Sequence, residues 1–89
     1  MASTLKGMDT EAGRASAKTL KAGADQLDQL TQNLTKSITT FAWQGADSVR
    51  TREQWNNGNV RILQGVASQL REFATLIEKQ AAEQDAVSN

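Results

Sequence analysis

The chain has 89 residues, with ten basic residues against ten acidic ones and no Cys, His, Tyr or Pro. A neutral charge balance disfavours binding to nucleic-acid phosphates, and the lack of His removes the usual general acid–base residue and the commonest metal ligand. We therefore expect one domain, residues 1–89, that is not an enzyme and uses no metal, cofactor, small-molecule substrate or nucleic acid.

The beginning of the chain, Met1 to Gly7, lacks the apolar core of a secretory signal. No run of about eighteen apolar residues follows it, so no membrane span is predicted. If the protein leaves the cell that makes it, we expect it to do so without a cleavable signal peptide.

A first helix is predicted over residues 9–42, with Asp9 as its N-cap. Its apolar residues fall within one arc of a helical wheel, and most of its charged residues fall opposite. Every seventh position from Leu20 to Phe41 is apolar, which is the spacing of a coiled-coil seam. The stripe expected to form a core or a dimer contact contains Leu20, Leu27, Leu30, Leu34, Ile38 and Phe41.

A turn is predicted at residues 43–45, near the midpoint of the chain. Gly45 allows a backbone conformation that other residues resist, and Trp43 is expected to cover the end of the helices. A second role is compatible with the first: the exposed turn forms part of a surface that another protein recognises.

A second helix is predicted over residues 46–83. Leu63, Leu70 and Ile77 are again seven apart. The pattern is lost from residue 84, so residues 84–89 are predicted to form a flexible tail. The expected stripe of this helix contains Leu63, Val66, Leu70, Phe73 and Ile77.

The cluster Asn56-Asn57-Gly58-Asn59 interrupts the second helix. In a straight helix, Arg52, Asn56 and Asn59 would lie on the apolar face. The helix then either kinks or unwinds locally and changes phase, or keeps these polar residues in the seam, where they fix register or partner choice. A true turn, giving three helices, is the third alternative, and we favour a continuous or kinked helix. The candidate partner-specificity residues are Arg52, Trp55, Asn56 and Asn59.

Two antiparallel helices of this length form a single layer, which leaves part of each apolar stripe uncovered. We therefore expect an all-α, antiparallel helix-turn-helix hairpin that pairs with a second hairpin into a four-helix bundle.

Trp43-x-Gly45 between two amphipathic helices, in a Cys-free chain of this length, resembles the WXG family of small secreted proteins (ESAT-six-like). The resemblance extends over nearly the whole chain, including Trp55 and the stripe after it. It implies a hairpin that dimerises with itself or with a related WXG-type protein. It also implies synthesis in the bacterial cytoplasm and export to the cell exterior by the type VII (ESX-like) machinery, which a membrane ATPase drives.

The chain departs from the family pattern after the second helix. Family members often carry Tyr-x-x-x-Asp/Glu there as an export motif, but this chain has no Tyr. Asp85 would supply the acid, whereas Ala81 occupies the aromatic position. Either a partner supplies the signal or this chain uses another determinant.

The leading functional hypothesis is a dimeric substrate or escort of the type VII secretion pathway that acts through helix packing. The alternatives are a coiled-coil adaptor that is never exported and a membrane-active amphipathic helical protein.

Overall fold

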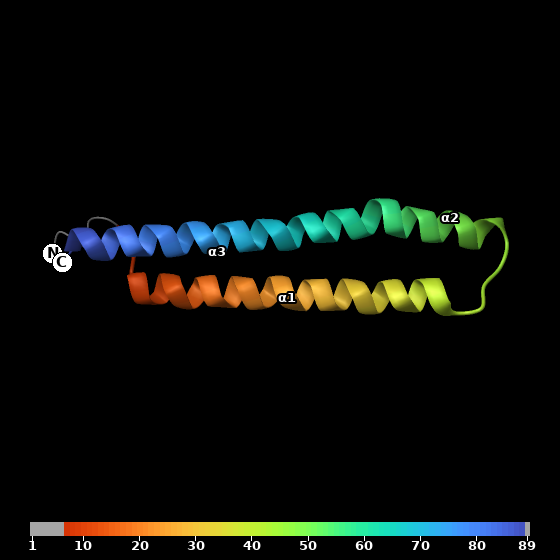
Figure 1. Ribbon diagram of the computed structural model, residues 1–89, viewed down its shortest axis with the longest axis horizontal. Coiled ribbons are helices and arrows are strands. Elements are labelled where there is room, and N and C mark those ends of the chain that lie inside the picture. The colour runs from red at the N-terminus through yellow and green to blue at the C-terminus, as the bar shows by residue number, and fades with distance from the viewer. Residues whose placement is uncertain (1–6, 89) are drawn as a thin grey trace.

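The computed structural model describes residues 7–88, which form a long helical hairpin (Figure 1). The first limb is α1 (Thr10–Thr40), and residues 41–45 reverse the chain. The second limb consists of α2 (Ala46–Gln54), the π-helical segment η2 (Trp55–Asn59) and α3 (Val60–Ser88). The two limbs run antiparallel and their Cα trace measures 66 × 16 × 14 Å. The predicted all-α hairpin is confirmed.

The first limb begins as predicted and ends slightly earlier. The Asp9 carboxylate accepts a hydrogen bond from the amide of Ala12 at 3.0 Å, which makes Asp9 the N-cap of α1. The helix ends at Thr40, two residues before the predicted boundary, because Phe41 has an extended backbone with ψ of 154°.

The second limb ends later than predicted. Helix α3 continues to Ser88, so residues 84–88 are helical and do not form the expected separate tail; Asn89 lies outside the described residues. An ion pair between Asp85 and Arg14 attaches this part of α3 to the start of α1. The apolar pattern, from which the boundary was predicted, carries no sign of that polar contact.

The centre of the contact between the limbs is made of small side chains. Thr31 continues this seam on α1 and is 6% exposed. The larger residues Leu20, Leu27 and Ile38 lie beside it and are half-buried. Alanine at heptad spacing on both helices permits a close approach of the two backbones. The fully buried members of the seam are Ala17, Ala24, Ala67, Ala74 and Ala81.

The Asn-rich cluster forms neither a turn nor a polar seam. Within η2 the hydrogen bonding changes to the π pattern, and the amide of Val60 donates to the carbonyl of Trp55. The extra residue in this turn rotates the following helix relative to the preceding one. This agrees with the prediction that the helix unwinds locally and changes phase at the cluster. Asn56 and Asn59 are therefore exposed.

None of the helices in the described part of the chain combines the length and apolar character needed to cross a membrane.

Candidate functional site

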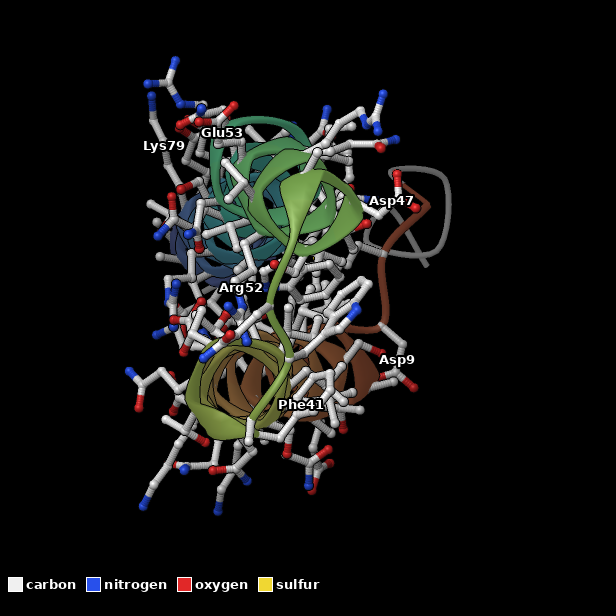
Figure 2. All side chains as sticks on the ribbon, turned by 90° about the vertical axis from the view of Figure 1, so that its right-hand side faces the viewer. Asp9, Phe41, Asp47, Arg52, Glu53 and Lys79 are labelled. Carbon is white, nitrogen blue, oxygen red and sulfur yellow. The ribbon has the colours of Figure 1, made fainter. Side chains whose placement is uncertain are left out.

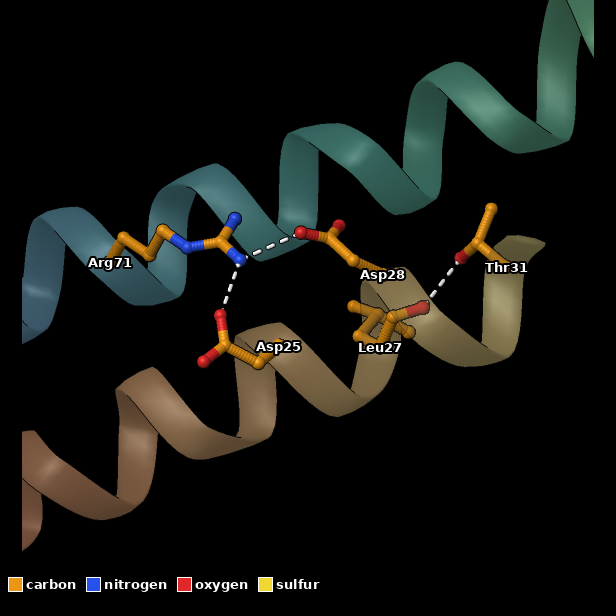
Figure 3. Close-up of polar contacts among 5 residues, drawn as sticks. All are labelled: Asp25, Leu27, Asp28, Thr31 and Arg71. Carbon is orange, nitrogen blue, oxygen red and sulfur yellow. Dashed lines mark hydrogen bonds and ion pairs between the residues drawn. The ribbon is translucent and has the colours of Figure 1, made fainter. Parts of the chain in front are cut away.

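One edge of the hairpin is charged, and Arg71 makes two of the ion pairs along it. From α3 its guanidinium reaches across to α1 and contacts Asp28 at 2.7 Å and Asp25 at 2.9 Å (Figure 3). These two carboxylates, that of Asp25 first, raise the pKa of Arg71 above its ordinary value. Thr31, a turn further along α1, directs its hydroxyl to its own helix and donates to the carbonyl of Leu27.

Two further ion pairs extend this edge toward the open end of the hairpin. Lys21 Nζ lies 2.8 Å from Glu78 Oε2, and Arg14 pairs with Asp85. The Arg14 guanidinium, followed by the hydroxyl of Thr10, lowers the pKa of the Asp85 carboxyl. The paired residues are seven apart on both helices, so they share one side. We call this side the charged edge; it consists of Arg14, Lys21, Asp25, Asp28, Arg71, Glu78 and Asp85.

The opposite edge of the hairpin is apolar. Leu30 lies two residues after Asp28, and Phe73 two after Arg71, which places each about 200° around its helix from the charged side chain at about 100° per residue. Both are about half exposed. The hairpin itself covers the large apolar side chains on this side only in part. We call this side the apolar edge; it consists of Leu30, Leu34, Ile62, Val66, Phe73 and Val87.

The turn forms a second candidate site, and Arg52 organises it. From α2 the guanidinium donates hydrogen bonds to three backbone carbonyls of α1 and the turn: Nε to Ile38 at 3.0 Å, one terminal nitrogen to Phe41 at 2.9 Å, and the other to Trp43 at 3.1 Å. Figure 2, a view along the hairpin from the turn, shows Arg52 between the limbs and Phe41 at the end of α1.

The rings of the turn pack against this guanidinium. Phe41 and Trp43 are stacked, with centroids 5.6 Å apart and an interplanar angle of 14°. The central carbon of Arg52 lies 5.6 Å from the Phe41 centroid and 5.9 Å from that of Trp43, within the range of cation–π attraction. We call Phe41, Trp43 and Arg52 the turn triad.

Gly45 ends the turn with φ of +109° and ψ of 173°. This combination confirms the prediction that the turn requires glycine. The carbonyl of Gly45 accepts hydrogen bonds from the hydroxyl of Ser48 at 2.8 Å and from the amide of Val49 at 3.3 Å, and Ser48 is buried. Gly45 therefore joins the turn to the first turn of α2.

The candidate specificity residues fall into two groups. Arg52 is engaged with the turn, and the indole nitrogen of Trp55 donates to Thr35 Oγ1 at 2.8 Å, so both contact the first limb. Asn56 and Asn59 are exposed, and a role in partner choice stays a prediction for them. The sequence places Arg52 on the inner face but carries no sign of its three carbonyl acceptors, because those acceptors are backbone atoms of a distant segment.

A shallow groove lies beside the charged edge. The shallow groove of about 330 Å³ next to Arg71 is lined by Asp28, Thr31, Gln32, Gln64 and Ser68, and its two charged side chains neutralise each other. Within residues 7–88, no three carboxylates come together as a metal site would require.

No protein-family model, curated protein or solved structure gives a significant match to this chain.

Proposed function

We propose that this protein is a WXG-type helical hairpin that pairs through its apolar edge and acts as a dimeric substrate or escort of a type VII secretion pathway. The apolar edge is the observation that carries the proposal. It exposes several large apolar side chains on one side of an 89-residue chain, and a second hairpin would bury them in a four-helix bundle.

The charge distribution supports the same function. The ion pairs of the charged edge join the two limbs of one hairpin, so their charges are largely neutralised within the molecule. The apolar edge lies on the other side, where pairing buries little unpaired charge. Burying an unpaired charge would strongly oppose association, whereas burying apolar surface favours it.

Light scattering of the purified chain tests the pairing. We expect a mass of two chains, either alone or after a related WXG-type protein is added. Phe73→Glu, on the apolar edge, should abolish pairing because it would bury a carboxylate. Gln64→Glu is the matched control, since it introduces the same side chain at an exposed position of α3 that lines the groove beside the charged edge. A stable monomer under all conditions, or equal effects of the two changes, would contradict the proposal.

The secretion role is tested in a bacterium that has a type VII system. We expect the full-length chain to accumulate in the culture medium, together with its partner where one is needed, and to disappear from the medium when the secretion ATPase is inactivated. Retention inside the cells of a chain that pairs normally would instead identify a non-exported adaptor.

A further inference from the structure

We propose that Arg52 is the positioning residue of the Trp43-Gln44-Gly45 turn, and that recognition of the turn during export depends on this arginine. The proposal rests on the function proposed above. It assigns to Arg52 a role inside its own hairpin in place of a contact with the partner.

The backbone at the end of α1 creates the need for such a residue. The last four carbonyls of a helix have no partner within the helix. The last turn of α1 contains no basic residue that would offset the negative end of the helix dipole. Arg52 brings a positive charge to this end of the helix and donates to the carbonyl of Ile38, at 3.0 Å.

The same guanidinium also holds the residues that follow the helix. Its two terminal nitrogens contact the carbonyls of Phe41 and Trp43, which are separated by one residue in the extended part of the turn. One rigid, planar group thereby fixes the exit of α1 and the backbone that carries the tryptophan. The rings of Phe41 and Trp43 stack on each other and both lie next to this group, which restrains the side chains as well.

The π-helical segment explains how Arg52 comes to face the turn. Trp55, three residues after it, contacts α1, and Val60 continues the inner face five residues later. In an uninterrupted α-helix, the inner face of α3 would continue back to Asn56 and Asn59. Helix α2 would then be rotated about its axis by about 100° relative to α1. The extra residue of η2 allows α3 to keep its seam while Arg52 points at the turn.

A lysine at position 52 cannot make the same set of contacts. Its ammonium group is a single point of positive charge, whereas the guanidinium presents several donors in a fixed plane. Arg52→Lys therefore keeps the charge and removes the simultaneous contact with three carbonyls. Arg52→Met removes both.

The experiment compares these two variants with Arg50→Lys in the full-length chain. Arg50 is a suitable control because it lies two residues away, is strongly exposed, and pairs with Asp47 of its own helix. Circular dichroism and light scattering first select variants with wild-type helix content and association. Amide hydrogen exchange of residues 42–46 and release into the medium are then measured.

We expect both Arg52 variants to exchange the turn amides about tenfold faster or more, with exchange in the middle of α1 unchanged, and to lose most of their export. Arg50→Lys should match the wild type in both measurements. Wild-type export of both Arg52 variants, or full rescue by Lys, would overturn the proposal. If the wild-type chain itself stays in the cells, the proposed function fails. Separately, unchanged hydrogen exchange of the turn amides in the Arg52 variants would overturn the positioning role.

Discussion

At the scale of single residues, the turn depends on the backbone of Gly45. Its φ of +109° with ψ of 173° lies in a region that side chains with a Cβ avoid. Space is not the constraint, since a Cβ added there would meet nothing within 4 Å. The requirement for glycine therefore comes from local backbone geometry alone.

Gly45→Ala is expected to lower the free energy of unfolding by about 1–3 kcal/mol, because alanine is strained in this conformation. The matched change is Gly65→Ala in α3, where an added Cβ also has free space and the backbone is helical. That change should raise the free energy of unfolding by up to about 1 kcal/mol. Urea unfolding followed by circular dichroism measures both, and effects of the same sign would refute the explanation.

Asp85 gives the hairpin a residue-scale dependence on pH. Its pKa is lowered in the folded protein, mainly by Arg14. The ion pair therefore stabilises the fold above the ordinary carboxyl pKa of about 3.9, and this contribution is lost as the pH falls through the lowered value.

An NMR titration of the Asp85 carboxyl is expected to give a pKa below about 3.9 in the wild type and a higher one in Arg14→Gln. Arg50→Gln is the control, since Arg50 contacts Asp47 at the other end of the hairpin. Identical titration of Asp85 in the wild type and in Arg14→Gln would show that Arg14 does not cause the shift.

At the scale of elements, η2 adjusts the phase of the second limb. Ser48, Arg52 and Trp55 contact the first limb or the turn before the inner face resumes at Val60. Trp55 and Val60 are five residues apart, whereas an α-helix repeats its face after three or four. The π segment absorbs the one residue in excess.

Deleting Asn57 should therefore convert η2 into ordinary α-helix with both inner faces preserved, and leave the melting temperature equal or higher. Deleting Glu72, which is also exposed and lies in α3, should lower the melting temperature, because the deletion rotates Ala74 and Ala81 out of the seam by about 100°. Thermal unfolding followed by circular dichroism compares the two deletions. If the Asn57 deletion lowers the melting temperature as much as the Glu72 deletion does, η2 does not adjust the helix phase.

The elements also show what the sequence can predict. The heptad spacing predicted both helices and the apolar stripes, and the Asn-rich cluster marked the position of the phase change. The periodicity of one helical segment does not determine how that segment is rotated relative to the next one, so the sequence alone does not distinguish a kink, a phase change and a turn at this cluster. The heptad spacing predicts a seam that contains Leu20, Leu27 and Leu34, whereas alanines occupy the centre of the contact. Only contact with the other helix distinguishes a buried alanine from an exposed one.

At the scale of the whole molecule, the hairpin has a narrow core and a large exposed apolar edge. Five alanines are its fully buried apolar residues in the described chain, whereas Phe73 and Ile62 remain 48% and 66% exposed. Burial of small side chains contributes little to stability compared with burial of large ones. Much of the stability should therefore come from pairing.

We expect the melting temperature to rise with protein concentration, because association stabilises the folded state by mass action. Calorimetry over a hundredfold range of concentration measures the effect. Phe73→Glu should melt at a lower temperature that is independent of concentration, and Gln64→Glu should behave as the wild type. A wild-type melting temperature that does not change over this range would contradict self-association and leave a different partner to be identified.

The slender outline of the hairpin has a consequence for passage through a channel. Thr10 and Ser88 lie at one end of the rod and the turn lies at the other, and the Cα trace is only 16 × 14 Å across its 66 Å length. A single hairpin that moves lengthwise therefore presents a narrow cross-section. For the proposed dimer, two such rods side by side would set the width that an export channel has to admit.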